Sequence, residues 1–479
     1  MEEYQILDGK GIIPDGTTEI KMMAFDSRKN LTSIEIPSSV TKIGLRAFRD
    51  CTGLTSIEIP DSVTEIGVCA FSGCSGLTSI KIPNSITKMD KGVFDGCKGL
   101  TSIEMPASVT EICNGAFEGC SGLTSIKIPD SVTEIGASAF GGCSGLTSIE
   151  IPASVTMISG NLFDGCTGLE KIVVSPENKD YDSRENCNAI IDTKYNELIA
   201  GCKNTKIPSS VTELKNGVFK GCTGLKSIEI PQSIEMIESS LFEGCTGLTS
   251  IKIPDSVTGI KSDAFKDCTG LTSIELPNSV DTIWYSAFQG CSKLTSIVIP
   301  QSVTSVGEGA FGGCTALEKI EVSPENTALD SRENCNAIIE TQSNRLEVGC
   351  KSTKIPASVA TIGSFSFDGC TGLSSIEIPD SVTEILSYSF NGCTGLVSIE
   401  IPGSVTKIED NSFKDCTGLT SVEFLGSIKK IGSDAFENCS SLAKILVPAK
   451  KMDYYKKRLP EKLHGLIVEQ EPKKKEKKK

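Results

Sequence analysis

The stretch CTGLTSIEIPDSVTEIGVCAFSG, Cys51 to Gly73, returns along most of the chain with a period of 23 residues. The next copies begin at Cys74 and Cys97, and one Phe recurs at the same place in each unit, as at Phe48 and Phe71. A fixed period of roughly 20–50 residues is typical of a solenoid, in which each repeat packs only against its neighbours. The repeat therefore overrides the ~3 globular domains that a chain of 479 residues would suggest.

Sixteen units carry this Phe, and two of the steps between them are longer than the rest. The steps Phe163–Phe219 and Phe311–Phe367 each span 56 residues, which is 23 plus 33. The two long segments are copies of each other, 148 residues apart, and they begin at Ser175 and Ser323. Each contains short apolar runs on both sides of a polar turn, which predicts a hairpin.

Within one unit, two short β-strands are expected. Leu54, Ile57 and Ile59 form the pattern L-x-x-L-x-L, the strand signature of leucine-rich repeats. Pro60 ends that strand because it has no N–H to donate, and a second short strand is expected near Ile66. The sequence thus predicts a curved leucine-rich-repeat β-solenoid with parallel strands, short 3₁₀-like turns around each Phe and few helices. With a strand spacing of about 4.8 Å, eighteen rungs would extend over roughly 85 Å.

The regularity of the repeat sets the expected domain boundaries. The first unit has Arg28 where later copies have Cys, and the pattern changes again after residue 443. A short helix near Met452–Lys457 and a strand near Leu466–Val468 are expected to close the last rung. The predicted parts are an entry rung (1–30), a solenoid (31–443) with long hairpin-bearing rungs at 170–208 and 318–356, a C-terminal cap (444–469) and a disordered basic tail (470–479).

The charge is unevenly distributed. The formal net charge is −14, but residues 444–479 hold 13 Lys/Arg and 5 Asp/Glu, so the first 443 residues carry −22. An acidic body argues against nucleic-acid binding along the solenoid, because phosphates are bound by Lys and Arg. The Lys-rich tail is instead a candidate for weak contact with an anionic lipid surface or polyphosphate, with a solvated tail as the alternative.

No segment of the sequence is typical of a membrane span or a secretory signal. No run approaches the ~18 apolar residues of a transmembrane helix. The first residues, MEEYQILDGKGIIPDG, have neither a basic start nor an apolar region. A cytoplasmic location therefore stays open beside the surface location considered next.

The units LTSIEIPDSVTEIGVCAF and the insert DSRENCNAIIDTKYNELIAGCKNTKIP resemble the BspA-like leucine-rich repeat proteins over roughly residues 10–468. The resemblance implies a non-enzymatic protein-binding function at the cell surface or after secretion. It also implies an adhesin that binds host matrix or plasma proteins such as fibronectin or fibrinogen, and it supplies no catalytic residues and no cofactor. The alternative is an intracellular protein-interaction scaffold.

The middle of each first strand carries a column of charged residues that is a candidate protein-binding face. The signs largely alternate from one rung to the next, which suits side-by-side pairing on parallel strands, and a merely solvated face is the alternative. Trp284 and Tyr285 interrupt the usual turn sequence and are the candidate anchor, because Trp and Tyr are enriched in binding hot spots. The residues of this candidate face are Glu58, Lys81, Glu104, Lys127, Glu150, Glu229, Lys252 and Glu275.

The 21 cysteines fall into two groups. Fifteen occupy one register of the repeat, where parallel side chains favour a buried column of thiols over disulfides. Cys187 with Cys202, and Cys335 with Cys350, are placed symmetrically about their hairpin turns and are candidate disulfides, since facing residues on antiparallel strands are close. Packed free thiols are the alternative for these four residues.

Enzymatic activity is not expected. The chain has one histidine, His464, in the expected cap, and no nucleophile with a positioned base is suggested by the sequence. No Cys-x-x-Cys pair is present, so the usual ligand spacing of a zinc site is missing.

Overall fold

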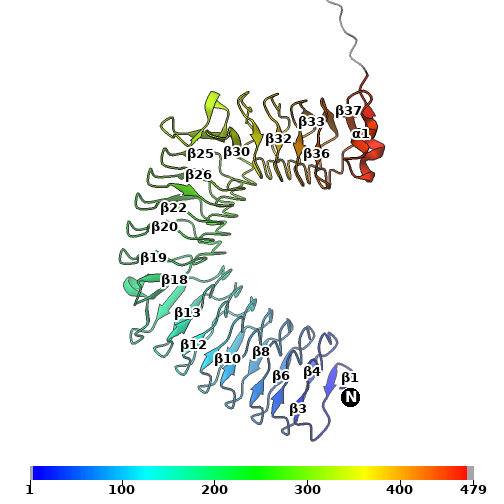
Figure 1. Cartoon of the computed structure of the whole chain (residues 1–479). Helices are drawn as coiled ribbons and strands as arrows, with labels where there is room; N and C mark the ends of the chain where they lie inside the picture. The colour runs from blue at the N-terminus through cyan, green and yellow to red at the C-terminus, as the bar shows by residue number, and fades with distance from the viewer. Residues whose placement is uncertain (1–3, 472–479) are drawn as a thin grey trace, which may run out of the picture. The chain divides into compact units, whose positions relative to one another are not determined.

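The computed structural model describes residues 4–471 as two compact units. The first contains the residues up to Ile234 together with Ser240–Gly247, and the second contains Glu235–Ser239 together with the residues from Leu248 onward. In each unit, successive rungs stack in chain order and pair mainly through parallel strands, with very few helices (Figure 1). The predicted parallel-strand solenoid of 23-residue turns is confirmed.

One side of each unit, here called the first face, is formed by the L-x-x-L-x-L strands. Strands of successive rungs pair in register, so that Ile57 lies beside Ile80 and Ile80 beside Ile103. In the first unit these strands are β4 (Ser33–Ile34), β6 (Ser56–Glu58), β8 (Ser79–Lys81), β10 (Ser102–Glu104), β13 (Ser148–Ile151) and β15 (Lys171–Val174). In the second unit they are β21 (Ser250–Lys252), β23 (Ser273–Glu275), β25 (Ser296–Ile299), β27 (Lys319–Val322), β33 (Ser398–Ile401), β35 (Ser421–Phe424) and β37 (Lys444–Val447).

The second face is formed by the shorter strands that follow the proline of each unit. Except in β22, where Gly259 is also buried, each has an exposed or half-buried residue followed by one that is buried or half-buried, because alternate side chains of a strand point to opposite sides. In the first unit these strands are β3 (Glu19–Ile20), β5 (Lys42–Ile43), β7 (Glu65–Ile66), β9 (Lys88–Met89), β11 (Glu111–Ile112), β12 (Glu134–Ile135), β14 (Met157–Ile158) and β19 (Glu213–Leu214). In the second they are β20 (Met236–Ile237), β22 (Gly259–Ile260), β24 (Thr282–Ile283), β26 (Ser305–Val306), β31 (Thr361–Ile362), β32 (Glu384–Ile385), β34 (Lys407–Ile408) and β36 (Lys430–Ile431).

The third side, here called the turn edge, is a series of tight turns around each Phe. The N–H groups of Cys69, Phe71 and Gly73 donate to carbonyls of the following rung at 2.9, 2.9 and 2.6 Å. Gly73 has φ +74°, a left-handed conformation that glycine adopts without steric cost. The backbone is thus bonded from rung to rung on all three sides, which leaves no unsatisfied edge within a unit.

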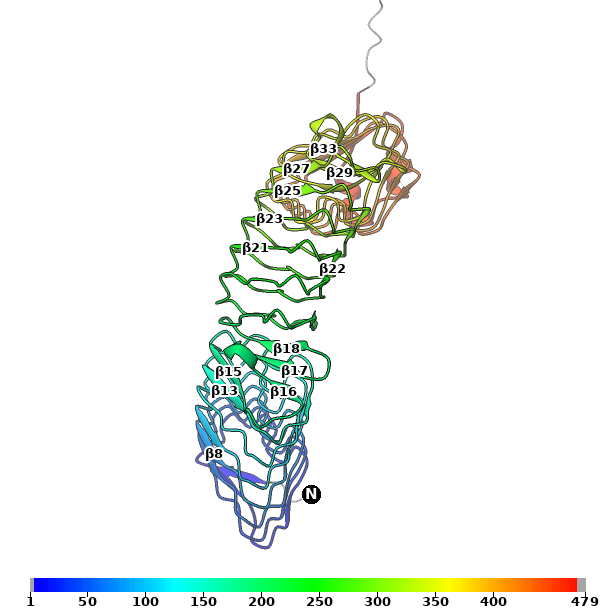
Figure 2. The same ribbon diagram turned by 90° about the vertical axis from the view of Figure 1, so that its left-hand side faces the viewer.

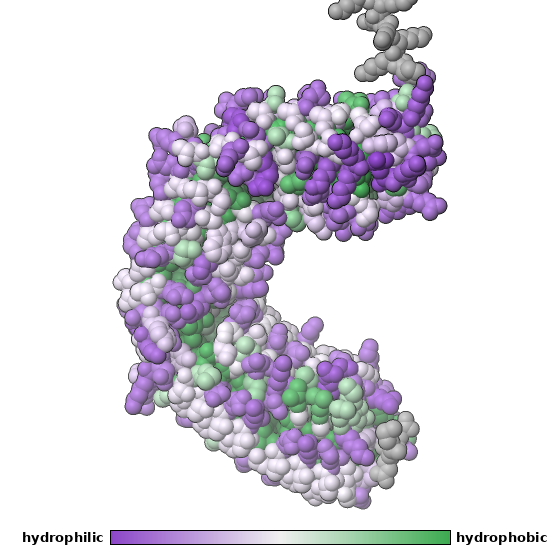
Figure 3. Space-filling model, in the orientation of Figure 1, coloured by the Kyte–Doolittle hydropathy of each residue, from purple (hydrophilic) through white to green (hydrophobic). Residues whose placement is uncertain are grey.

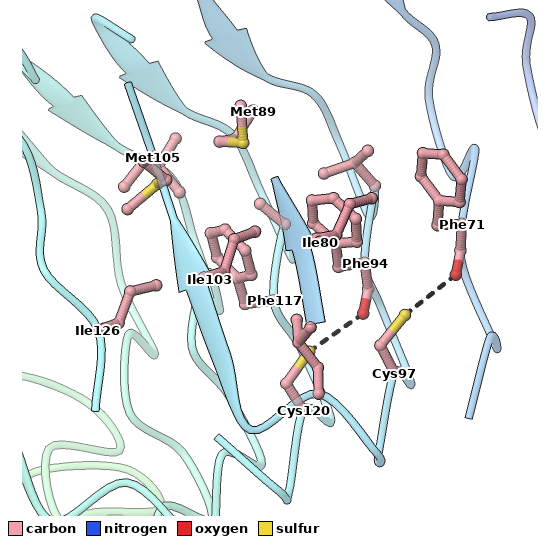
Figure 4. Close-up of a cluster of buried hydrophobic side chains, with 14 of the residues drawn as sticks. Phe71, Ile80, Met89, Phe94, Cys97, Ile103, Met105, Phe117, Cys120 and Ile126 are labelled. Atoms are coloured by element: carbon pink, nitrogen blue, oxygen red, sulfur yellow. Dashed lines mark hydrogen bonds between the residues drawn. The ribbon is translucent and has the colours of Figure 1, made fainter. Parts of the chain in front are cut away.

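The core lies between the three sides and repeats with the rungs (Figure 4). Phe48 and Phe71 stack with ring centroids 5.3 Å apart and an interplanar angle of 4°. The buried cysteines line the same core, and Cys97 Sγ donates to the Phe71 carbonyl oxygen at 3.1 Å. Cys120 makes the same contact with the Phe94 carbonyl, and most ladder cysteines tie their unit to the preceding one in this way.

Each unit contains one of the long segments, which adds strands beside the second face. In the first unit, β16 (Tyr181–Asp182), β17 (Ala189–Asp192) and β18 (Glu197–Gly201) pair antiparallel and lie next to β15 (Figure 2). In the second unit the same arrangement is made by β28 (Leu329–Asp330), β29 (Ala337–Glu340) and β30 (Arg345–Gly349). The expected hairpins are therefore present, each preceded by a 3₁₀ turn at Arg184–Asn186 or Arg332–Asn334.

The two ends of the described chain have their own closing elements. At the start, β1 (Gln5–Leu7) and β2 (Lys10–Ile12) form a hairpin, and the Tyr4 ring contacts Phe25 with a centroid distance of 5.2 Å. At the end, α1 (Met452–Lys456), a 3₁₀ helix at Glu461–Leu466 and β38 (Ile467–Glu469) follow β37. These match the expected short helix and closing strand. The expected Lys-rich tail, apart from Gln470 and Glu471, lies outside the described residues.

Candidate functional site

The predicted charge column is fully exposed along the first face. Glu58 lies directly beside Lys81 on paired strands, and Lys81 lies beside Glu104. All eight predicted residues are exposed, and among the described residues no ion pair joins any two of them. The expected side-by-side pairing is therefore absent, and the charges of this column are not engaged with one another.

A different column, on the second face, makes the ion pairs. Lys42 Nζ lies 2.9 Å from Glu65, and Lys88 Nζ lies 3.0 Å from Glu111, each across a pair of adjacent parallel strands. The side-chain hydrogen bond from Lys88 lowers the pKa of Glu111. The charges alternate in sign along the chain in both columns, so the sequence did not reveal which column would form ion pairs between adjacent rungs.

A groove runs along the first face of the first unit, beside the exposed column. It has a volume of about 900 Å³ and includes Lys127, Glu150 and Lys171 in its lining. Val173 stands in the column position of its rung, directly beside Glu150, and lines the same groove. The groove therefore combines unpaired charges of both signs with an apolar side chain, which is a composition suited to a protein segment.

The same positions of the repeat line further grooves. One of about 890 Å³ includes Glu229 and reaches the long segment at Asn188 and Lys203. Another, in the second unit, has a volume of about 430 Å³ and includes Lys252 and Glu275. Five of the eight predicted residues thus line grooves on the first face. In Figure 3, apolar surface is visible in patches between polar side chains.

Two apolar residues of the column were missed because the column was examined for charge alone. Val298, in β25, is 54% exposed at the position that Glu275 occupies one rung earlier. Val173, in β15, holds the equivalent position in the first unit. An exposed valine in the middle of an otherwise charged column was the available signal.

The candidate anchor residues lie away from this column. Trp284 and Tyr285 directly follow β24 on the second face and are 39% and 62% exposed. Lys261 Nζ stands 6.0 Å from the centroid of the Trp284 ring, and the same ammonium group bonds Glu238 at 2.6 Å. The structure therefore confirms that both aromatic residues are accessible but does not bring them together with the charge column.

A β-bulge in each hairpin moves the cysteines of the candidate disulfides out of register. All 21 cysteines lie within residues 4–471, and none of them forms a disulfide. The register of β17 with β18 shifts between Ile190 and Ile191, so Cys202 comes opposite Asn188, whose carbonyl oxygen accepts from its thiol at 3.4 Å. The same shift occurs between Ile338 and Ile339 in β29. Cys187 and Cys335 therefore do not face Cys202 and Cys350, contrary to the symmetry about each turn.

The remaining chemistry of the described residues is sparse. His464 lies in the cap, with its Nε2 3.0 Å from the Leu459 carbonyl oxygen. No group of three or more His, Cys, Asp or Glu within residues 4–471 is arranged to hold a metal ion. None of the helices in this part of the chain has the length and apolar character to cross a membrane.

Parallel rungs, L-x-x-L-x-L strands and an exposed first face define a leucine-rich repeat protein. Five overlapping segments, 10–124, 92–222, 190–318, 235–343 and 341–457, match the family model described as "BspA type Leucine rich repeat region (6 copies)". These segments cover nearly the whole chain, and the protein belongs to the BspA-type leucine-rich repeat family. Comparison with curated proteins gave no match.

Several solved structures are similar to this chain. A leucine-rich repeat protein from Bacteroides ovatus is 27% identical, with a TM-score of 0.36, and covers 87% of this chain and 92% of its own. A leucine rich cell surface protein from Faecalibacterium prausnitzii is 28% identical, with a TM-score of 0.36. The similarity covers 89% of this chain and 82% of that protein's chain. The pneumococcal vaccine antigen PcpA is 19% identical, with a TM-score of 0.41. The similarity covers 92% of this chain and 80% of the PcpA chain.

Proposed function

We propose that this protein is a non-enzymatic binding protein of the cell surface, an adhesin that holds host matrix or plasma proteins such as fibronectin or fibrinogen. Membership of the BspA-type family over residues 10–457 supports an interaction role. The observation that carries the proposal is the exposed charge column beside the groove of about 900 Å³. Among the described residues, no ion pair joins any two of the eight predicted charges, so these charges are available to a partner.

The first-face groove is the proposed binding site, with Lys127, Glu150 and Val173 at its centre. Charged groups at the rim of an interface chiefly govern the association rate and the choice of partner. A buried apolar contact at the centre supplies much of the affinity. Val173, half-buried and beside Glu150, is placed to make such a contact.

A paired charge exchange tests the site. Lys127→Glu combined with Glu150→Lys keeps the net charge and reverses the local pattern, and it should weaken binding of fibronectin or fibrinogen about tenfold if these charges face the partner. Surface plasmon resonance on the full chain supplies the measurement. Lys88→Glu combined with Glu111→Lys is the matched control, because it exchanges a pair on the second face that is already bonded.

The outcomes separate the site from the function. Loss of binding only in the first-face variant supports both the adhesin and the groove. Equal binding by all three proteins would place the site elsewhere. Absence of micromolar or tighter binding to fibronectin, fibrinogen and host cells by the unaltered chain would contradict the adhesin role itself.

The absence of disulfides among the described residues favours a second candidate, an intracellular scaffold. None of the 21 cysteines, which all lie within residues 4–471, forms a disulfide, and cysteines without disulfides are typical of a reducing compartment. Protease treatment of intact native cells distinguishes the two candidates. Digestion from outside supports surface display, whereas full protection with cleavage only after lysis supports the scaffold.

A further inference from the structure

The turn edge of the second unit carries two aromatic residues in a backbone conformation that is costly for them. Two positions before each core Phe, the chain has a positive φ in nearly every rung, and the residues there are mostly small or polar, such as Ser138, Ser240 and Ser286. Phe365 and Tyr388 occupy this position with φ of 57° and 59°. A non-glycine residue pays roughly 1 kcal/mol or more for this conformation. Both side chains are only half-buried, so core packing does not account for them.

The Phe365 ring lies between an aromatic residue of the following rung and a glycine of the preceding rung. The rings of Phe365 and Tyr388, in successive rungs, stack with centroids 4.7 Å apart and an interplanar angle of 6°. Gly309 occupies the same turn position on the opposite side, and a Cβ built there would lie 3.8 Å from Phe365 Cβ. Gly309 is buried, whereas Phe365 and Tyr388 are half-buried, so solvent reaches part of the aromatic pair beside this glycine.

The rung before Gly309 adds two more exposed aromatic residues. The Ser286 N–H donates to the Glu308 carbonyl oxygen at 3.3 Å, which places Trp284 and Tyr285 next to the segment Gly307–Gly309. In that segment Glu308 is the only residue with a side chain, and it is exposed. We call the five residues Trp284, Tyr285, Glu308, Phe365 and Tyr388 the aromatic edge.

Carboxylates outnumber cations beside the aromatic edge. Arg345 Nε bonds Glu347 at 2.6 Å and its Nη2 lies 4.0 Å from Glu340. Burial raises the pKa of Glu347, Arg345 opposes this rise, and the carboxylates of Glu340 and Glu308 add to it. Arg345 is thus engaged by Glu347 and Glu340, while the exposed Glu308 makes no ion pair among the described residues, so an additional cation would be attracted to Glu308.

We propose that the aromatic edge is a second docking surface, which binds an arginine-rich segment of a partner protein. One guanidinium stacks on the solvent-accessible part of the Phe365 and Tyr388 rings and pairs with the exposed Glu308. Arginine suits this site better than lysine, because its planar and weakly hydrated group stacks on aromatic rings. The surface is separate from the first-face groove and does not depend on the partner proposed there.

Labelled homopeptides provide the test. Hexa-arginine, hexalysine and hexacitrulline are titrated with the full chain at about physiological salt, where long-range attraction to the acidic body is screened. Fluorescence anisotropy should show hexa-arginine binding at least about fivefold tighter than hexalysine, since stacking adds to the charge attraction. Hexacitrulline, which is flat but uncharged, should not bind.

The variant Phe365→Ser with Tyr388→Ser copies the residue found at this turn in other rungs. It should reduce the affinity for hexa-arginine to that for hexalysine, while the melting temperature stays the same or rises because the strained aromatic residues are removed. Glu308→Gln should weaken binding of both cationic peptides. Tyr195→Ser, an exposed aromatic residue on the hairpin of the first unit, is the control and should keep the arginine preference.

Three outcomes would overturn the proposal. The first is equal affinity of the unaltered chain for hexa-arginine and hexalysine. The second is a preference for arginine that survives the double substitution. The third is a fall in melting temperature of the double variant with unchanged peptide binding, which would assign the aromatic pair to folding alone.

Discussion

At the scale of single residues, burial controls the chemistry of the thiols. Burial raises the pKa of Cys51 to about 12, and the pKa of Cys97 is also raised by burial, with a further rise from the neighbouring Cys120 and Cys74. A thiol reacts as its thiolate, so such groups are inert near neutral pH. Three cysteines are only partly buried: Cys69, in a turn with φ of 54°, Cys113 and Cys439. Burial still raises the pKa of Cys113 to about 12 and that of Cys439 to about 11.

We therefore expect one reactive cysteine in the folded protein. Titration with a thiol reagent at about pH 8 should label Cys69 quickly, and the other cysteines should react only after denaturation, since the thiolate is the reacting form. Cys69→Ser should abolish the rapid phase. Rapid labelling of several ladder cysteines in native buffer would contradict the buried column.

One buried carboxyl makes the stability of the first unit depend on pH. Burial raises the pKa of Asp164 to about 6, and the carboxylates of Glu243 and Glu118 raise it further against the effect of Lys220. An unfolded Asp titrates near pH ~4, so between these values the folded chain keeps a proton that the unfolded chain has lost. The resulting stabilisation is fully present below about pH 4 and is lost as the pH rises through about 6.

Asp164→Asn should remove this dependence. At pH ~7.5 the variant should be more stable than the parent protein by about 1 kcal/mol, and at pH ~4 the two should be equally stable. The value of about 1 kcal/mol allows for solvent screening of the half-buried carboxyl. Urea unfolding at both pH values gives the measurement, with the exposed Asp61→Asn as control. An equal gain at both pH values would show that charge is not the cause.

At the scale of the elements, one arginine organises each long segment. Arg184 Nε donates to Asp182 at 2.9 Å, and its Nη1 donates to Asn196 Oδ1 in the hairpin turn at 3.0 Å. Arg332 repeats these contacts with Asp330 and Asn344 at 2.8 and 2.9 Å. The guanidinium thus joins the start of the segment to the tip of its hairpin.

Arg184→Lys should loosen the hairpin of the first unit. Lysine keeps the charge but cannot make the forked contact with both partners, and the loss should be about 1–2 kcal/mol. Hydrogen exchange should accelerate within residues 181–201. Arg332→Lys should affect the corresponding part of the second unit and leave residues 181–201 unchanged, and a uniform change over both units would contradict a local role.

The elements also show how far the sequence determines the structure. The 23-residue period predicted both strands of each unit, and the apolar runs around a polar turn predicted the hairpins, because each follows from local pattern and burial. The bulge at Ile190 and Ile191 was not predictable from symmetry about the turn, and it moved Cys202 opposite Asn188. The sequence also did not show which of the two charge columns would form ion pairs. Charges alternate in sign in both columns, yet Lys42 and Glu65 form an ion pair whereas the adjacent Glu58 and Lys81 do not.

At the scale of the molecule, every regular rung is interchangeable with its neighbour. Deleting residues 74–96 joins Gly73 to Cys97 and removes one unit, and each remaining contact keeps a partner of the same kind. We expect cooperative thermal unfolding with a melting temperature within about 5 °C of the parent. Deleting only residues 74–84 should prevent folding, because it places apolar and polar residues on the wrong sides.

The regular hydrogen bonding between rungs at the turn edge affects how the gene can gain or lose repeat units. A gene that encodes such rungs contains near-identical stretches, and unequal exchange between them would remove or add whole units in frame. The product would present a shorter or longer binding surface, altered in steps of about 4.8 Å, without any new packing problem to solve. The number of rungs can therefore change more readily than the fold of a single rung.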